Sequence, residues 1–417
     1  MDLHLEKAKD KSQKAKVKIT GSKSETNRLL LLQALYPNLT LENTSNSDDS
    51  EVMQKALNSQ FTIHNSELID VHHAGTAMRF LTAFFAIQEG KEVVLTGSSR
   101  MKERPIKILV DALNQLGAEI SYEENEGFPP IRIKGKKLTQ NKVSLPANVS
   151  SQYISALLLI APKLENGLEL TLEGEITSVP YIKMTLALLN EIGVKTSFIG
   201  NKITVCHAEL VSASQLTVES DWSSASYWYS IVALSEIGIQ ISLSSYKENS
   251  LQGDSALVEI YQDFGVETTF NSDNSITISK ERIHNSQLTT HNSQLNNSPD
   301  IAQTIAVTCF GLGMGCDLTG LHTLKIKETD RLEALKMELT KLGAEISVTN
   351  DSLYLKSSSA IKEKISISTY QDHRMAMAFA PLALKVPIII ENAEVVSKSY
   401  PSFWEDLKKA GFLIEEI

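Results

Sequence analysis

The sequence has few of the features that mark membrane, disulfide-rich or secreted proteins. Only three of its 417 residues are cysteines, and no two form a CxxC pair. We therefore expect no disulfide framework, which fits a reducing cytoplasm. The longest apolar stretches, near Tyr153–Pro162 and Met375–Leu384, are well short of the roughly 18 residues that a membrane-spanning helix needs. The polar, lysine-rich start at Met1–Thr20 lacks the apolar region of a secretory signal.

The sequence also lacks an excess of positively charged residues. Forty Lys and Arg residues stand against 50 Asp and Glu residues, which gives a formal net charge of -10. Such a balance disfavours nucleic acid and other polyanions as partners. The histidines show no HExxH or Cys/His spacing, so we expect no metal site. If the protein binds anions, it must do so in local pockets, and the position of each cation becomes informative.

A pattern of helix, glycine and strand recurs along the chain. Val110–Glu119 reads VDALNQLGAE and Ala334–Glu345 reads ALKMELTKLGAE. Looser copies lie at 186–195, 258–267 and 404–413, and a degenerate one at 51–62. The glycines suit left-handed helix C-caps, and the alternating segments after them predict two strands joined by a turn. Such joints are common in α/β proteins, but their regular recurrence predicts six helix-plus-hairpin units, three in each of two lobes.

One segment looks inserted. Ile283–Asn297 reads IHNSQLTTHNSQLNN, a close tandem of HNSQL. Its polar, repetitive composition predicts a surface loop.

The first of seven charged clusters is Gly21–Arg28, GSKSETNR, between a strand-like KVKIT and an apolar helix. Glycine, hydroxyls and unpaired N–H groups at a helix N-terminus favour anions, and Lys23 and Arg28 add full charges. The GxxxxGK[ST] pattern of a Walker loop is absent. The alternative is a capped helix with surface cations.

Six further clusters have the same character, most of them at predicted helix starts. They are Ala74–Arg79, Arg100–Ile106, Val149–Tyr153, Pro299–Asp300, Leu324–Arg331 and Gln371–Ala378. Each could alone be a structural cap or salt bridge: Arg79 should be paired, Ser150 and Ser151 could cap a helix, and Asp300 could be a base or an N-cap. Together they predict several helix N-termini and cations that converge on bound anions.

Taken in order, these motifs resemble the 3-phosphoshikimate 1-carboxyvinyltransferase (EPSP synthase) family. The motifs GSKSxTNR, AGTAMR, RMKERPI, VSSQ, SVPY, PDIAQT, KETDR, DHRMAM and KSYP run from Gly21 to Pro401, which is nearly the whole chain. Each match alone is weak, whereas the ordered set is highly specific.

The resemblance implies an α/β protein with the two-lobed enolpyruvyl-transferase fold, each lobe built from three similar units. It places the N-terminal lobe at residues 21–220 and the C-terminal lobe at residues 1–20 plus 221–417, with the active site in the cleft between them. It also implies transfer of the enolpyruvyl group of phosphoenolpyruvate to the 5-hydroxyl of shikimate 3-phosphate, with release of phosphate.

By resemblance, Asp300 is the base, Glu328 the acid, and Lys23 stabilises charge. The residues implied to bind shikimate 3-phosphate are Lys23, Ser24, Arg28, Ser150, Ser151, Gln152, Ser178, Asp300 and Lys327. Those implied to bind phosphoenolpyruvate are Lys23, Gly75, Arg100, Gln152, Arg331, Arg374 and Lys398. No cofactor or metal is implied. Arginine is well suited to these ligands because its guanidinium binds carboxylate and phosphate through two parallel hydrogen bonds.

Some positions depart from the family pattern: Thr20 and Phe80 stand where proline is common, His73 where asparagine is common, and Thr323 where an asparagine contact is often found. Two alternatives stay open. One is the related UDP-N-acetylglucosamine enolpyruvyl transferase, which DHRMAM, KETDR and SSQ disfavour. The other is a non-catalytic anion-binding protein on the same fold, which the pairing of Asp300 with Glu328 disfavours. We expect a cytoplasmic monomer that binds these small molecules and neither nucleic acid nor membrane.

Overall fold

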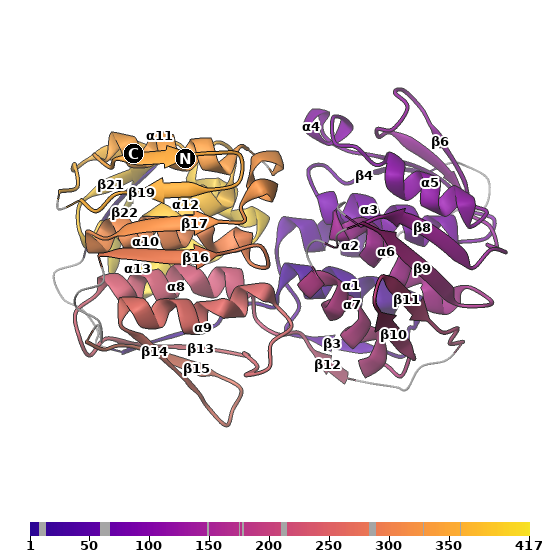
Figure 1. Cartoon of the computed structure of the whole chain (residues 1–417), viewed down its shortest axis with the longest axis horizontal. Coiled ribbons are helices and arrows are strands. Elements are labelled where there is room, and N and C mark those ends of the chain that lie inside the picture. The colour runs from indigo at the N-terminus through magenta and orange to yellow at the C-terminus, as the bar shows by residue number, and fades with distance from the viewer. Residues whose placement is uncertain are drawn as a thin grey trace. The chain divides into compact units, whose positions relative to one another are not determined.

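The computed structural model describes the chain except residues 8–13, 59–66, 148–149, 175, 177–178, 210–214, 283–288, 328 and 359. The chain divides into two compact units. The N-terminal unit is Gly21–Val218, and the C-terminal unit is Met1–Thr20 together with Glu219–Ile417. Each unit has its own hydrophobic core, and neither core takes a residue from the other unit. We describe the units separately (Figure 1).

The N-terminal unit contains two four-stranded sheets and one two-stranded sheet. The strand orders are β4-β5-β7-β6, β10-β11-β9-β8 and β12-β3. The strands are β3 (Thr40–Glu42), β4 (Glu67–Asp70), β5 (Glu92–Thr96), β6 (Glu119–Tyr122), β7 (Ile131–Lys134), β8 (Lys142–Pro146), β9 (Leu168–Glu173), β10 (Thr196–Ile199), β11 (Lys202–Val205) and β12 (Gln215–Thr217). The helices are α1 (Lys23–Leu35), α2 (Asp48–Leu57), α3 (Gly75–Ala86), α4 (Ser99–Lys102), α5 (Lys107–Gln115), α6 (Ser151–Ile160) and α7 (Val179–Glu191).

The C-terminal unit contains three four-stranded sheets, in the orders β14-β15-β13-β2, β16-β17-β19-β18 and β20-β21-β1-β22. The strands are β1 (Leu3–Lys7), β2 (Lys14–Val17), β13 (Gln240–Leu243), β14 (Val266–Phe270), β15 (Ile276–Lys280), β16 (Thr290–Gln294), β17 (Gly315–Thr319), β18 (Ile346–Val348), β19 (Leu353–Leu355), β20 (Ile365–Ile367), β21 (Ile388–Ile390) and β22 (Phe412–Glu416). The helices are α8 (Trp222–Leu234), α9 (Leu257–Ile260), α10 (Ala302–Leu312), α11 (Arg331–Lys341), α12 (His373–Phe379) and α13 (Phe403–Lys409), with short 3-10 turns η2 (Gly253–Ala256) and η4 (Pro299–Ile301).

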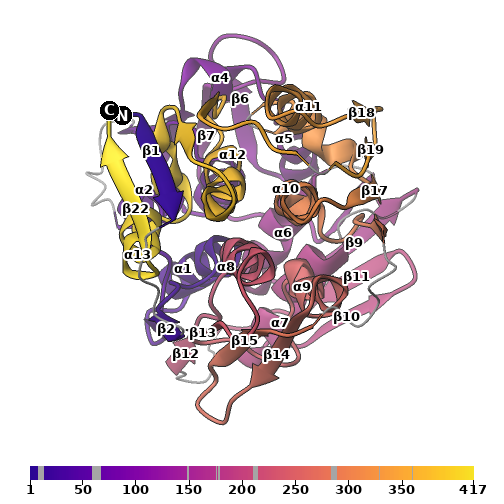
Figure 2. The same ribbon diagram turned by 90° about the vertical axis from the view of Figure 1, so that its left-hand side faces the viewer.

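The five four-stranded sheets share one pairing pattern. In each, two strands pair in parallel at one side and an antiparallel hairpin follows, as in β4, β5, β7 and β6. Helices α5, α7, α11 and the α9 region each precede such a hairpin. Strand β22 follows α13 and pairs with β1, the first strand of the chain (Figure 2). In this sheet, strands from the two ends of the chain therefore form the antiparallel pair. The predicted α/β fold with repeated units is therefore confirmed in these five sheets.

The sixth, degenerate copy is different. Helix α2 forms as predicted, residues 59–66 after it lie outside the described part of the chain, and the next described strand, β4, pairs in parallel with β5. The two-stranded sheet near this copy of the repeat consists of the parallel pair β12 and β3. Elsewhere the glycines of the repeat do end their helices: Gly117, Gly193, Gly265, Gly343 and Gly411 all have positive φ angles.

Three helices in each unit are mostly buried. Helix α3 (GTAMRFLTAFFA) has one residue that is not buried, Thr76, and α8 likewise has only Ser223. A helix that is apolar on all sides must be enclosed. Helices α1, α3 and α6 pack together in one unit, and α8, α10 and α12 pack together in the other. The starts of these helices carry most of the charged motifs, so packing of the core also positions the candidate site.

The surface-loop prediction for Ile283–Asn297 is wrong for the residues that are described. Thr290–Gln294 form β16, which pairs in parallel with β17. His291 and Leu295 are buried, 3% and 1% exposed. A short strand alternates its side chains between two faces and needs few buried ones, here His291 with Leu295 directly after the strand, so a polar composition does not exclude it.

Within the described residues, no helix is long and apolar enough to cross a membrane. The same part of the chain contains no group of three or more His, Cys, Asp or Glu side chains that could hold a metal ion.

Candidate functional site

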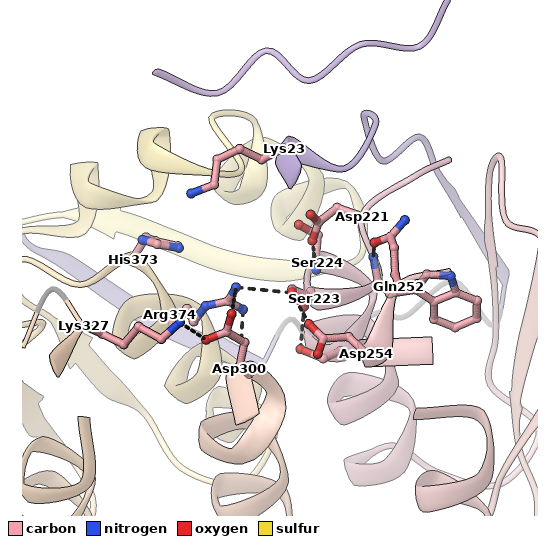
Figure 3. Close-up of polar contacts among 12 residues, drawn as sticks. Lys23, Asp221, Ser223, Ser224, Gln252, Asp254, Asp300, Lys327, His373 and Arg374 are labelled. Atoms are coloured by element: carbon pink, nitrogen blue, oxygen red, sulfur yellow. Dashed lines mark hydrogen bonds and ion pairs between the residues drawn. The ribbon is translucent and has the colours of Figure 1, made fainter. Parts of the chain in front are cut away.

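Three predicted cations surround one predicted base in the C-terminal unit. The Asp300 carboxylate lies 2.8 Å from Nη1 of Arg331, 3.5 Å from Nζ of Lys327 and 3.3 Å from Nη2 of Arg374. Figure 3 shows Lys327 and Arg374 reaching Asp300. Asp300 sits in η4, just before α10, and α10 has no side-chain cap. The carboxylate therefore organises cations and does not act as the N-cap of α10.

A second carboxylate fixes two of these cations. Asp372 is fully buried and accepts hydrogen bonds from Nε of Arg331 at 2.6 Å and from the backbone N–H of Arg374 at 2.8 Å. Asp372 thus caps α12 and holds Arg331, the first residue of α11, at the same time. Arg331 itself is 1% exposed, which makes this pair a buried, charge-assisted contact with fixed geometry.

Arg374 has a further partner on the opposite side. Its Nη1 donates to the backbone carbonyl of Asp300 at 3.2 Å, and its Nη2 donates to Oγ of Ser223 at 3.3 Å. Ser223, at the start of α8, donates in turn to the carboxylate of Asp254 in η2. Figure 3 shows Asp254, Ser223, Arg374 and Asp300 in one chain of contacts.

Burial and charge change the proton affinities of this chain. Burial and, to a lesser extent, the charge of Asp300 together raise the pKa of Asp254 to about 7, against the opposing effects of Arg374 and Ser223. Burial alone would lower the pKa of Arg374, but the charges of Asp300, Tyr227 and Asp254 keep that pKa well above its ordinary value. Arg374 is a permanent cation, whereas Asp254 exchanges its proton near neutral pH.

In the N-terminal unit, Lys23 lies at the first turn of α1. Its Nζ is 3.4 Å from Oδ2 of Asp49, which is 7% exposed, and His73 Nε2 is 3.9 Å from the other oxygen. The preceding Gly21 packs so closely that a Cβ atom would lie 2.0 Å from the carbonyl oxygen of Asn43. Only glycine permits this approach, which sets where α1 begins.

Arg28 is enclosed on the next turn of α1. Its guanidinium donates to Oγ1 of Thr185 at 2.8 Å, to Oγ of Ser155 at 2.9 Å and to the backbone carbonyl of Ser24 at 2.6 Å. The ring of Phe80 lies 5.4 Å from the guanidinium carbon. Burial lowers the pKa of Arg28 to about 10, so the charge persists at neutral pH. Arg28 ties α1 to α6 and α7 and also bonds to Ser24 in the first turn of its own helix.

Gly75 opens α3 beside Arg104, a cation of the predicted cluster Arg100–Ile106 that is not among the predicted ligands. A Cβ atom on Gly75 would lie 2.6 Å from Nη1 of Arg104. Gln152 of α6 is held close by, because its side-chain amide donates to Oγ1 of Thr76 at 3.0 Å. Arg79 is structural: it donates to the carbonyls of Gly75 and Pro105, which agrees with the expectation that it is paired.

Ser150 caps α6, since its hydroxyl accepts a hydrogen bond from the N–H of Gln152 at 3.4 Å. Ser151 follows as the first residue of that helix and is 8% exposed. The alternative that these hydroxyls belong to a helix cap therefore holds for Ser150. The cap also places Gln152 next to Thr76.

Two predicted residues lie apart from these contacts. Arg100 is 63% exposed and paired with Glu103 at 2.7 Å. Lys398 donates to the backbone carbonyl of Gln371 at 2.7 Å, one residue before Asp372. Two others, Ser178 and Glu328, lie outside the described residues.

Sequence reasoning missed Asp254 and Ser223, as well as Thr185 and Ser155 beside Arg28. A single carboxylate or hydroxyl carries no spacing signal, and chain folding alone brings these groups to the arginines. The pattern DWSS (Asp221–Ser224) at a helix start was the available hint, because Asp221 does cap α8 by accepting from the N–H of Ser224 at 2.7 Å.

Comparison with known proteins identifies the family of this chain. The sequence profile of EPSP synthase (3-phosphoshikimate 1-carboxyvinyltransferase) matches residues 38–407. A protein from Bacteroides fragilis named 3-phosphoshikimate 1-carboxyvinyltransferase is 46% identical over 406 residues, with 96% of both chains covered. One of the same name from Haemophilus influenzae is 36% identical, covering 94% of this chain and 95% of that one.

Solved structures support the fold. An EPSP synthase from Acinetobacter baumannii superposes with a TM-score of 0.79 at 20% identity and full coverage of both chains. An enolpyruvyl transferase from Streptomyces tendae gives a TM-score of 0.70 at 13% identity, covering 99% of this chain and 98% of that one. The two-lobed enolpyruvyl-transferase fold is thus confirmed, and by its sequence this chain belongs to the EPSP synthase (3-phosphoshikimate 1-carboxyvinyltransferase) family.

Proposed function

We propose that the chain transfers the enolpyruvyl group of phosphoenolpyruvate to the 5-hydroxyl of shikimate 3-phosphate, and that its two units are the two lobes that the sequence predicts. The observation that carries the proposal is the set of three cations held around Asp300. The two substrates together bring two phosphates and two carboxylates. A chain with a net charge of -10 can hold them only where cations are concentrated locally.

Asp300 is the proposed base. Lys327, Arg331 and Arg374 all face its carboxylate. Anionic substrate groups would take over part of this cation shell. The same binding event would place the carboxylate beside the attacking hydroxyl. Exchange of partners is therefore the proposed means of activation.

The remaining roles are proposed from the family resemblance. Lys23 would stabilise charge on the reacting groups, and Glu328 would protonate the enol carbon. Lys23 now faces Asp49, so an incoming phosphate would compete for the same ammonium group.

The remaining ligands of shikimate 3-phosphate would be Ser24, Arg28, Ser150, Ser151, Gln152, Ser178 and Lys327. For phosphoenolpyruvate they would be Gly75, Arg100, Gln152, Arg331, Arg374 and Lys398. A direct contact by Arg28 would either use an N–H that its bonds to Ser24, Ser155 and Thr185 leave available or displace one of these bonds. Arg100 would have to leave Glu103, which costs little for a pair so exposed.

The experiment is phosphate release from purified protein given both substrates, in wild type, Asp300→Asn and Arg374→Ala. The asparagine keeps the shape of Asp300 and removes the base, so kcat should fall at least about 100-fold. Asp317→Asn is the matched control, since Asp317 is an exposed carboxylate on β17 of the same unit. No release from folded wild-type protein would contradict the proposal, as would Asp300→Asn that keeps wild-type turnover.

We also propose that the protein acts as a monomer in the cytoplasm. Each unit has a complete core of its own, which gives no structural need for a second chain. Light scattering of the purified protein at working concentrations tests this point, and a dimer mass would contradict it.

A further inference from the structure

The start of α8 and the turn η2 form a polar assembly behind Arg374. Gln252 accepts a hydrogen bond from the N–H of Trp222 at 3.0 Å and donates to the carbonyl of Ser220 at 2.9 Å. Glu219 accepts from the indole N–H of Trp222 and from Oγ of Ser250, both at 2.8 Å. These buried bonds fix η2, and Asp254 with it, against the first turn of α8.

Ser223 connects this assembly to the cation. Its hydroxyl has one hydrogen to donate and two lone pairs to accept. The hydrogen goes to Asp254, and one lone pair accepts from Nη2 of Arg374 at 3.3 Å. A serine hydroxyl rotates freely when nothing holds its hydrogen. Asp254, 6% exposed and fixed on η2, removes that freedom and presents the lone pair to Arg374.

The position of the guanidinium is then determined from two sides. Asp300 binds it through its side chain at 3.3 Å and through its backbone carbonyl at 3.2 Å, and Ser223 binds it from α8. In the proposed reaction, the Asp300 carboxylate gives up part of its contact with Arg374 when substrate binds. Ser223 is the contact that keeps Arg374 in place at that moment.

We propose that Asp254 and Ser223 are positioning residues that hold the Arg374 guanidinium ready for the carboxylate or phosphate of phosphoenolpyruvate. This inference rests on the proposed function, which gives Arg374 that ligand. Neither residue contacts the reacting atoms in the proposal, and both act through the arginine. Their removal should affect binding of one substrate, while a general role in folding would affect both.

The test is steady-state kinetics with each substrate varied in turn. Hydrogen bonds to charged groups are each worth enough to change affinity about 10-fold or more. We expect Ser223→Ala and Asp254→Ala to raise KM for phosphoenolpyruvate about 10-fold, with kcat and KM for shikimate 3-phosphate within about threefold of wild type. Ser223→Thr keeps the hydroxyl and should restore the lower KM. Ser235→Ala, at the far end of α8, is the matched control because its hydroxyl bonds only within the helix at Ile231.

A double-variant cycle separates a chain of contacts from two independent effects. If Asp254 acts through Ser223, the double variant should bind phosphoenolpyruvate no more weakly than Ser223→Ala alone. Additive effects would overturn the proposal, as would an unchanged KM, an equal rise of both KM values, or a threonine variant as weak as the alanine variant. If the wild type itself releases no phosphate, the proposed function fails first, and that result is distinct from a functional wild type with unaffected variants.

Discussion

Asp254 is the residue whose proton should most visibly link the stability of the C-terminal unit to pH. Its pKa rises from an ordinary 3.8 to about 7, first through burial and then through the charge of Asp300. Between pH 3.8 and pH 7, Asp254 keeps its proton in the folded state but has released it in the unfolded chain. The free energy of unfolding therefore falls as pH rises through this window, and the decrease is complete above pH 7.

The magnitude follows from the size of the window. Each pH unit over which one proton separates the two states changes the free energy of unfolding by about 1.4 kcal/mol. From pH 5 to pH 8 the change attributable to Asp254 is then roughly 3 kcal/mol. Asparagine keeps the shape and a hydrogen-bond acceptor for Ser223 but cannot titrate. Asp254→Asn should gain roughly 3 kcal/mol relative to wild type over the same interval.

The assay is urea unfolding followed by tryptophan fluorescence at several pH values from 5 to 8. All three tryptophans, Trp222, Trp228 and Trp404, lie in the C-terminal unit and are buried, so the signal reports the unit that contains Asp254. Asp317→Asn provides the exposed control and should follow wild type at every pH. The reasoning is refuted if wild type and Asp254→Asn stay a constant distance apart, within about 0.5 kcal/mol, across the interval.

Three further changes test other parts of the structure. Arg331→Met leaves the fully buried Asp372 carboxylate without the arginine that pairs with it. Urea unfolding should show the C-terminal unit destabilised by about 3 to 5 kcal/mol, and a loss below about 1 kcal/mol would contradict a stabilising role for this ion pair. Deleting residues 289–295 removes β16 together with buried Leu295, so the urea midpoint of the same unit should fall; an unchanged midpoint would restore the surface-loop interpretation. Gly75→Ala should change the free energy of unfolding by less than about 1 kcal/mol, because the new methyl displaces only the end of the Arg104 side chain. The variant should nevertheless raise KM for phosphoenolpyruvate, and an unchanged KM would show that Gly75 is not part of the site.

Much of the fold could be predicted because it repeats. Five helix-ending glycines with positive φ and five sheets with one pairing pattern follow from a local signal that recurs along the chain. The prediction was wrong at β16, where the polar tandem HNSQL forms a strand that buries His291 and is followed by buried Leu295. A strand that short takes its structure from its neighbour β17 and not from its own composition.

The site was predictable in its charges and less so in its partners. Motif order pointed to Asp300, Lys327, Arg331 and Arg374, and the structure brings these four together. The same reasoning could not find Asp254, because a lone carboxylate after a glycine has no pattern of its own. It also could not show that Arg28 is enclosed by protein hydrogen bonds, since enclosure depends on α6 and α7 arriving beside α1.

The carboxylates around the C-terminal cluster explain how an acidic protein can keep a cation-rich site without disrupting its fold. Three cations in close contact would repel one another, and Asp300 and Asp372 offset that repulsion before any ligand is present. If Asp254 were fully ionised as well, these six side chains would carry no net charge. Its pKa of about 7 keeps part of the population neutral near physiological pH, so this set of six keeps a slight positive charge. The same carboxyl group that anchors Ser223 thus also contributes to how strongly the cluster attracts an anion, and KM for phosphoenolpyruvate should rise less between pH 6 and pH 8 in Asp254→Asn than in wild type.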